Sequence, residues 1–353
     1  MGSVFLLIAI GLTSLFSLSG MHSIHFFERQ LIWTAVGIVL LIVFSMIDFR
    51  IFRTQTAAVM SLYILAVLFL TMVLIVGPRV RGIRAWLQFG GIALQPVELA
   101  KLALVVLLAK FFSKRHIEIY RARHLVVSGL YLAMPLLLVL AQPDPGSAVV
   151  LVAIWVGVVL FSGMRLRHFF YLAVAGIAVA CIAWFFILLP YQRSRITSFL
   201  DPYRDPQGAG YQMIQSMIAV GSGRVWGKGL GYGSQSHLHF LPEAHADFIF
   251  AAYAEEWGFI GSATVLGLLG IVLWRIIRIG AVARDNFSRL FTLGFAALIA
   301  TQSFIHIGMN MGVLPITGIT LPFVSYGGSS LVTLMIGLGI VQNIHINARR
   351  EVE

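Results

Sequence analysis

The chain is dominated by apolar runs of about 17 to 25 residues, the length at which a helix crosses a lipid bilayer. Ten such runs can be drawn, over residues 4–18, 31–47, 57–77, 96–112, 124–141, 147–163, 168–189, 248–274, 289–311 and 328–346. The alternation of polar and apolar residues that is typical of a membrane barrel is absent. The sequence therefore predicts an all-α, polytopic integral membrane protein with about ten transmembrane helices in a single membrane domain, 1–353.

Composition excludes a soluble globular domain. Hydrophobic residues make up 59% of the chain and charged residues only 11%, against roughly 25% charged residues in ordinary soluble proteins. The formal net charge of +11 would suggest a nucleic-acid partner in a soluble protein. In a membrane protein, an excess of Lys and Arg first reflects the orientation of the chain across the membrane, so no nucleic-acid partner is expected.

The basic residues assign the two sides of the membrane. Most of them fall in one set of loops, namely Arg50, Arg53, Lys110, Lys114, Arg115, Arg121, Arg123, Arg165, Arg167, Arg275, Arg278, Arg284, Arg289, Arg349 and Arg350. The opposite short loops hold Arg29, Arg79, Arg81 and Arg84. Since Lys and Arg collect in cytoplasmic loops, the first set is predicted to be cytoplasmic, together with both termini. The N-terminal run lacks a basic leader and is interpreted as the first span.

The extracytoplasmic side carries the longest loop, over about residues 190–247, between predicted spans seven and eight. Its stretch 211–223 places Met213, Ile214, Met217 and Ile218 at helical spacing, which predicts a helix lying in or against the membrane interface. The stretch 84–99 also looks interfacial, with Trp86 as an anchor. Long ordered loops are usually functional, so a site is expected on this side.

Two charges stand inside predicted span four. Glu98 and Lys101 are three residues apart, on one helical face, and can neutralise each other. A charge at membrane depth is costly and is by default a functional hypothesis. Either the two residues form a structural ion pair, or they line a polar cavity that opens outward.

A second group of titratable residues surrounds the start of predicted span eight: Glu243, His245, Asp247, Glu255 and Glu256. Asp247 could simply cap the helix. Crowded carboxylates in low dielectric also favour a raised pKa on one of them, which suits a general base. One of Glu255 and Glu256 could face water or pair with a loop arginine.

Further polar residues have structural interpretations. Asp144, between two prolines, is expected to cap span six, and Gln302, His306 and Asn310 to hydrogen-bond between helices. Arg193, Arg195, Arg81 and Arg84 could hold phosphate or meet lipid headgroups. The single cysteine, Cys181, excludes an intrachain disulfide. No P-loop, zinc spacing or Ser-His nucleophile motif is present.

Four segments resemble the SEDS proteins (shape, elongation, division and sporulation), polytopic glycan polymerases of bacterial cell-wall synthesis. They are GIRAWLQFGGIALQPVELAK, AQPDPGSA, the stretch from YQMIQSMIAVGSG to EEWGFIG, and GMNMGVLPITGITLPFVSYGGSS. The segment GSQSHLHFLPEAHADFIFA resembles the rod-shape (elongation) branch of this family more than the division branch.

The resemblance implies a peptidoglycan glycosyltransferase of the bacterial cytoplasmic membrane, active on the extracytoplasmic face. The implied substrates are lipid II and the nascent glycan strand, joined in β-1,4 linkage with release of undecaprenyl diphosphate. The implied partners are a class B penicillin-binding protein and other membrane proteins of the elongation complex. A lipid II flippase and a non-catalytic scaffold for the penicillin-binding protein remain as alternatives.

The resemblance also assigns residues. Asp247 matches the family's essential acidic residue, Glu98 and Lys101 match its polar pair, and Leu321–Ser330 matches the signature ahead of the last span, which includes Ser325. His306 and Pro145 depart from the family, where many members have Asn and Leu, respectively.

Asp247 is the expected base for the attacking 4-hydroxyl, since inversion of the configuration at the sugar carbon C1 suggests a single displacement. The diphosphate needs positive charge from Lys101, a loop arginine such as Arg193 or Arg195, or a divalent cation, Mg or Mn; His245, Glu243 and Ser325 are further candidate contacts.

Overall fold

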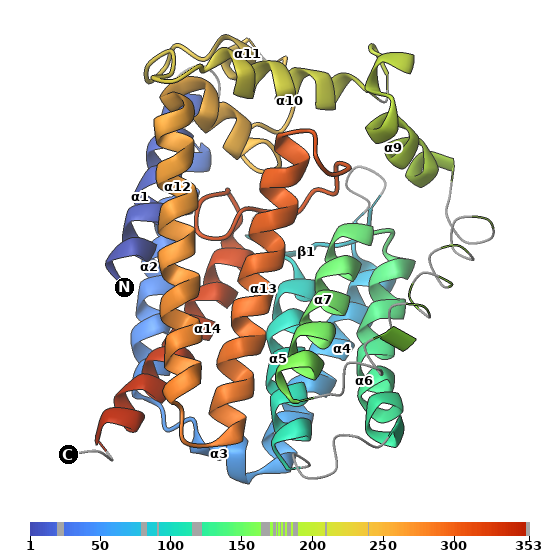
Figure 1. Cartoon of the computed structure of the whole chain (residues 1–353), viewed down its shortest axis with the longest axis vertical. Helices are drawn as coiled ribbons and strands as arrows, with labels where there is room; N and C mark the ends of the chain where they lie inside the picture. The colour runs from blue at the N-terminus through green and yellow to red at the C-terminus, as the bar shows by residue number, and fades with distance from the viewer. Residues whose placement is uncertain are drawn as a thin grey trace.

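The computed structural model is a tall bundle of helices with a layer of short helices across one end (Figure 1). It describes residues 1–19, 25–78, 83–89, 92–114, 122–163, 190–208, 210–238 and 240–350, together with isolated residues between 170 and 185. Within these residues, seven helices are long and apolar enough to cross a membrane. The predicted all-α membrane architecture is therefore confirmed, apart from one small hairpin.

Nine of the ten predicted spans coincide with a described helix. These are α1 (Gly2–Ser19), α2 (His25–Met46), α4 (Thr56–Val76), α5 (Pro96–Ser113), α6 (Ala122–Ala141), α7 (Pro145–Phe161), α12 (Ile249–Val282), α13 (Asn286–Asn310) and α14 (Gly328–Arg350). The predicted span 168–189 lies largely outside the described residues. The largest boundary errors are at the start of α2 and the end of α12, where the helix continues past the apolar run into interfacial residues.

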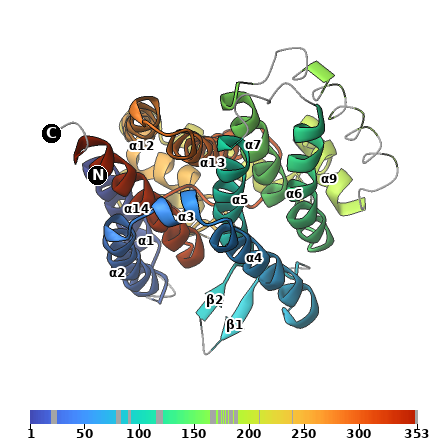
Figure 2. The ribbon, with the colours of Figure 1, turned by 90° about the horizontal axis from the view of Figure 1, so that it is seen from below.

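Helix α5 occupies the centre of the bundle. Seen along the bundle axis, it is surrounded by α4, α6, α7, α13 and α14 (Figure 2). Almost every side chain from Pro96 to Phe112 is buried, whereas the lipid-facing helices bury only one stripe. A helix enclosed by other helices can hold polar groups that lipid would exclude, and α5 is the described helix that buries Glu98, Lys101 and Lys110.

Both chain ends lie on the same side of the bundle. Helix α1 ends beside the layer formed by α10 (Tyr211–Ser222) and α11 (Ser234–His237), because Ser17 hydrogen-bonds to Glu256 and lies 3.3 Å from His237. Helix α14 starts near that layer and runs away from it (Figure 1). The shared side agrees with the topology predicted from the basic residues.

The outer layer contains the long extracytoplasmic loop. After α9 (Pro190–Leu200) and a 3-10 turn at Pro202–Arg204, α10 forms the amphipathic helix predicted at 211–223. Met213 is buried and Met217 packs against Gly312, while Ile218 is exposed. The stretch around Trp86, predicted to lie at the interface, forms an antiparallel hairpin of β1 (Leu87–Phe89) and β2 (Ile92–Leu94).

Helix α12 is interrupted at Gly258. Its φ of 65° and ψ of −158° belong to a region that is essentially restricted to glycine. The interruption is filled by backbone from the loop: Lys228 and Gly229 donate to the carbonyls of Glu255 and Glu256, both at 3.0 Å. Phe259 N donates to Arg224 O at 2.8 Å and Ile260 N to Val225 O at 3.2 Å. Residues 224–229 are thereby hydrogen-bonded to both segments of α12, before and after Gly258.

Candidate active site

A cavity of about 760 Å³ opens at the end of the bundle that carries the outer layer. Its walls come from the start of α2, the β1–β2 hairpin, the turn before α12 and the loop between α13 and α14. Asp247, His245, Glu243, Asp144, Arg195 and Arg29 all line it. The structure thus brings together residues from four distant parts of the sequence, at the end where a site was expected.

The turn that carries Asp247 is tightly hydrogen-bonded. The carbonyl of Glu243 accepts from the backbone N–H groups of Ala246, Asp247 and Phe248, at 3.0 to 3.3 Å. Glu243 itself has a φ of 56°, which a non-glycine residue rarely adopts. The N-cap of α12 is Phe248, so Asp247 stands one residue outside the helix and the capping interpretation is not needed.

Asn310 at the end of α13 fixes this turn from behind. Its Nδ2 donates to Asp247 O at 3.0 Å and to His306 O at 2.8 Å, while its Oδ1 accepts from Ala251 N at 3.1 Å. Its own carbonyl accepts from Ser216 Oγ of α10 at 2.8 Å. A fully buried amide that bonds both a carbonyl and an N–H has only one orientation that satisfies both, so Asn310 sets the position of the Asp247 backbone.

Ser325 fixes the turn from the other side. Its hydroxyl donates to Ala246 O at 2.9 Å and accepts from Leu321 N at 2.8 Å. The next residue, Tyr326, donates its N–H to His245 O at 3.0 Å. Ser325 is buried and is not among the residues that line the cavity, so its contacts are structural.

His245 is held as part of the cavity wall. Its ring stacks on Phe26, with centroids 4.0 Å apart, and meets Tyr326 edge-on. Its Nε2 lies 3.5 Å from Glu243 Oε2. Gly318, opposite, would place a Cβ 3.7 Å from Asp247 Oδ2, so the glycine leaves room beside the carboxylate.

Asp144 caps helix α7, as expected. Its carboxylate accepts from Ser147 N at 3.0 Å and from Ser147 Oγ at 2.6 Å. It also lines the cavity, which the sequence did not reveal. Asp144 can both cap α7 and line the cavity because the N-terminus of α7 faces the cavity.

Glu98 and Lys101 do not line the cavity. Lys101 Nζ lies 2.6 Å from Glu98 Oε1, and the two side chains are 2% and 7% exposed. The pairing matches the structural interpretation of these two charges. Toward the cytoplasmic end, α5 continues with buried apolar residues from Leu102 to Ala109.

The candidate phosphate-binding arginines lie in different places. Arg195 lines the cavity, whereas Arg193 donates to Phe185 O at 3.1 Å and is not among the lining residues. Arg84 donates to Leu74 O at 2.9 Å, so it holds the hairpin against α4. Arg81 lies outside the described residues.

Glu255 and Glu256 are both buried, which corrects the expectation that one of them faces water or an arginine. Glu255 pairs with Lys228 at 2.7 Å and accepts from Gln235 N and Ser236 N. Glu256 binds His237 at 3.0 Å and Gly231 N at 3.1 Å. The two carboxylates organise the glycine-rich turn, because their oxygens satisfy backbone N–H groups that the turn leaves unpaired.

The polar residues of α13, Gln302, His306 and Asn310, form only some of the predicted hydrogen bonds between helices. Asn310 bonds to the start of α12, and His306 Nδ1 lies 2.7 Å from Ile319 O in the following loop. Within the described part of the chain, neither amide atom of Gln302 has a hydrogen-bond partner. These residues therefore stabilise the loop after α13 and the turn at Asp247 more than they join neighbouring helices.

Three residues with carboxylates line the cavity, namely Asp247, Glu243 and Asp144. The described residues contain no group of three or more His, Cys, Asp or Glu side chains close enough to form a metal site alone. Mg²⁺ usually takes one or two carboxylates and completes its shell with water and substrate phosphates. The residues present fit that mode of binding.

Several residues of the site could not be anticipated. Arg29, Gln88, Gln95 and Tyr326 line the cavity, and no sequence feature marks any of them individually. Ser329 Oγ accepts from Gln95 N at 3.0 Å and joins the hairpin to α14. Gln88, Gln95 and Tyr326 lie inside the segments 84–99 and 321–330, which stood out only as whole segments, whereas Arg29 lies outside both.

Comparison with known proteins gives consistent matches over nearly the whole chain. The FtsW/RodA/SpoVE family model, described as cell cycle protein, matches residues 1–350. The chain is 37% identical to stage V sporulation protein E of Bacillus subtilis, over 96% of this chain and 94% of that one. It is 38% identical to the peptidoglycan glycosyltransferase MrdB of Escherichia coli K12, over 95% and 89% of the two chains.

Solved structures agree with these sequence matches. A chain of a peptidoglycan synthase complex, whose structure describes the coordination of polymerization and crosslinking, superimposes with a TM-score of 0.82 at 35% identity. The match covers 98% of this chain and 97% of that one. The rod shape determining protein RodA of Thermus thermophilus superimposes with a TM-score of 0.72 at 30% identity, over 98% and 95% of the two chains.

Proposed function

The chain belongs to the FtsW/RodA/SpoVE family, and on that premise we propose that the cavity at Asp247 is the active site of a peptidoglycan glycosyltransferase. The observation that carries the proposal is that a half-buried carboxylate, held by a fully bonded turn, lines a cavity with both charged and apolar walls. The enzyme is a multi-pass protein of the bacterial cytoplasmic membrane. Its cell-shape role corresponds to that of its relatives MrdB and RodA.

The reaction joins the 4-hydroxyl of one lipid-linked sugar to C1 of another. The C1–oxygen bond to diphosphate breaks as the new C1–O4 bond forms, and the electron pair leaves with the diphosphate. Asp247 accepts the proton of the attacking hydroxyl as that oxygen becomes bonded to carbon. A positioned base of this kind contributes about 10²- to 10⁴-fold in rate.

The position of the base is set by its surroundings. The Glu243 carbonyl, Asn310 and Ser325 hold the backbone around Asp247, and Gly318 leaves space in front of the carboxylate. Because three elements fix the turn, the side chain loses little freedom when a saccharide binds. Such preorganisation is a usual source of catalytic advantage.

The leaving diphosphate requires positive charge. Arg29 and Arg195 line the same cavity as Asp247, whereas Lys101 is committed to Glu98. We assign the diphosphate to Arg29 and Arg195 in place of Lys101 and Arg193. A divalent cation, Mg or Mn, held by Glu243 or Asp144 would neutralise charge on the diphosphate when bound.

The apolar part of the cavity suits the lipid half of the substrate. Ile32, Trp33 and Val36 of α2 line it, and Ile32 and Val36 are exposed on the outer surface of the bundle. A polyprenyl chain can therefore lie along α2 in the bilayer while the sugar reaches Asp247. This arrangement supports lipid II and the lipid-linked glycan strand as the substrates.

The expected partner is a class B penicillin-binding protein, with other membrane proteins of the elongation complex. Support comes from the similar chain in a peptidoglycan synthase complex, which coordinates polymerization with crosslinking. A flippase is less consistent with the structure. Between Lys101 and Lys110, α5 presents only buried apolar side chains, so no polar path continues along it toward the cytoplasm.

The direct test replaces the carboxylate with its isosteric amide. Asp247→Asn should lower polymerisation of purified lipid II about 10²- to 10⁴-fold and leave the melting temperature within a few degrees of the wild type. Asp201→Asn, an exposed extracytoplasmic carboxylate outside the cavity, is the matched control and should retain full activity. Full activity of Asp247→Asn would refute the role of the base. If that variant retained lipid II binding without polymerisation, a pure scaffold role would also be excluded.

A further inference from the structure

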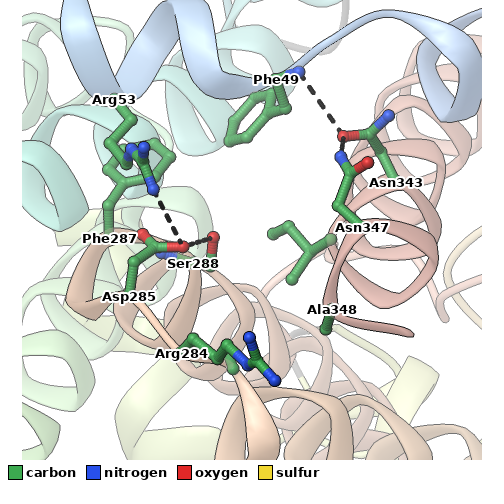
Figure 3. A pocket seen from close by; sticks show the side chains of 11 residues that line it. Phe49, Arg53, Arg284, Asp285, Phe287, Ser288, Asn343, Asn347 and Ala348 are labelled. Atoms are coloured by element: carbon green, nitrogen blue, oxygen red, sulfur yellow. Dashed lines mark hydrogen bonds and ion pairs between the residues drawn. The ribbon is translucent and has the colours of Figure 1, made fainter. Parts of the chain in front are cut away.

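A second cavity, of about 250 Å³, lies at the cytoplasmic end of the bundle. It is formed by the short helix α3 (Arg50–Thr54), the start of α13 and the end of α14 (Figure 3). Its charged residues are Arg53, Arg284 and Asp285. The polymerisation chemistry does not use this cavity, which is at the opposite end of the bundle from Asp247.

The charge balance of the cavity is positive. Arg53 Nη1 lies 3.8 Å from Asp285 Oδ2, which is longer than a hydrogen bond. The Asp285 carboxylate is already engaged as the N-cap of α13, accepting from Ser288 N at 2.9 Å and Ser288 Oγ at 2.7 Å. The Arg53 side chain is 47% exposed, so its guanidinium can form a closer contact with an anion that enters.

Nearby lysines add to the positive field. Lys110 of α5 donates to Arg53 O, and Lys114 Nζ lies 3.2 Å from Thr56 Oγ1. The first bond places an ammonium group at α3 and the second places one at the start of α4. Since this end of the bundle faces the cytoplasmic leaflet, the anions in reach include the headgroups of acidic phospholipids.

The remaining walls suit the glycerol end of such a lipid. Asn347 Nδ2 donates to Asn343 Oδ1 at 2.9 Å (Figure 3). Asn343 Nδ2 also donates to Ser45 O at 2.9 Å. Phe49 and Phe287 add buried aromatic surface. Polar amides beside aromatic rings match the boundary between a headgroup and its acyl chains.

We propose that this cavity binds the phosphate group of an acidic phospholipid of the cytoplasmic leaflet. The cavity is lined by two arginines and one aspartate, and Lys110 and Lys114 lie nearby, so an anionic group is favoured there. The Asp285 carboxylate is part of the site and lowers its affinity for multiply charged anions. A lipid bound here joins α3, α13 and α14.

The test uses the purified full-length protein and compares thermal stability and lipid retention with three probes. Phosphatidylglycerol should bind and stabilise the protein, whereas phosphatidylcholine and inorganic phosphate should have little effect. Arg53→Gln/Arg284→Gln should weaken phosphatidylglycerol binding about 30-fold, if each arginine contributes about 1 kcal/mol. Arg278→Gln is the matched control, because Arg278 lies over the Trp274 ring and outside the cavity.

A second variant covers the case in which the double variant does not fold. Asp285→Asn keeps an N-capping side chain and removes the negative charge, so phosphatidylglycerol should bind several-fold more tightly. Equal effects of phosphatidylglycerol and phosphatidylcholine, or no change in either variant, would overturn the proposal. Full stabilisation by inorganic phosphate alone would overturn the lipid as the source of the phosphate.

Discussion

The role of Asn310 can be tested by separating its hydrogen-bond donor from its acceptor. Asn310→Ala removes both, leaving Asp247 O, His306 O and Ala251 N without this partner. An unpaired buried polar group costs about 1–3 kcal/mol, so the variant should lose several kcal/mol of stability. The donor to Asp247 O is one hydrogen bond of about 1 to 1.5 kcal/mol, and its loss from the reacting geometry corresponds to about tenfold in kcat.

Asn310→Asp is the discriminating variant. It has almost the same shape and still accepts from Ala251 N, but it cannot donate to Asp247 O and places a negative charge against two carbonyls. If the amide positions the base, Asn310→Asp should reduce kcat at least as strongly as Asn310→Ala. Lipid II KM should change less than kcat, because Asn310 does not line the cavity.

The assay measures initial polymerisation rates over a range of lipid II concentrations, with the melting temperature measured in the same detergent. Ser128→Ala is the matched control, since it removes the hydrogen-bond partner of a buried Trp155 N–H between α6 and α7. It should lower the melting temperature and leave kcat unchanged. Wild-type kcat in Asn310→Asp, or a lowered melting temperature in Asn310→Ala without any change in kcat, would refute the positioning role.

Two further predictions concern stability. Gly258→Ala should destabilise the protein by about 3 kcal/mol or more, because the added Cβ would lie 2.3 Å from Gly227 N in a backbone conformation restricted to glycine. The matched control is Gly267→Ala, where the added Cβ meets open space. Equal denaturation midpoints of the two variants would contradict this prediction. Lys101→Met alone should cost about 3–5 kcal/mol by leaving Glu98 buried without its partner, whereas Glu98→Gln/Lys101→Met should recover most of that loss. Equal melting temperatures of the single and double variants would argue against the ion-pair interpretation.

Most of the membrane fold could be predicted from the length of the apolar runs. Even α5, with Glu98, Lys101 and Lys110, is recognisable because the remaining residues are apolar and Pro96 starts the helix. The hairpin β1–β2 could not be predicted, since its strands have three residues each and carry no usable periodicity. Its formation depends on contacts with α14 and α4, including the bonds of Ser329 and Arg84.

The candidate site was predicted in part. Asp247, Glu243 and His245 are close in sequence, so their shared position at the cavity followed from one segment. The support from Asn310 and Ser325 comes from residues that are 63 and 79 positions away from their partners in the chain, and single-sequence periodicity contains no information on such contacts. The same limit explains why Glu255 and Glu256 looked like candidates for chemistry, although they anchor a turn.

The interruption of α12 at Gly258 has a mechanical consequence. Two backbone hydrogen bonds join residues 224–229 to the first segment of α12, at Glu255 and Glu256, and two join them to the second segment, at Phe259 and Ile260. Asp247 lies just before the first segment, so the same loop fixes the angle between the segment that follows Asp247 and the rest of α12. The amides of Lys228, Gly229, Phe259 and Ile260 should accordingly exchange with deuterium at a common rate.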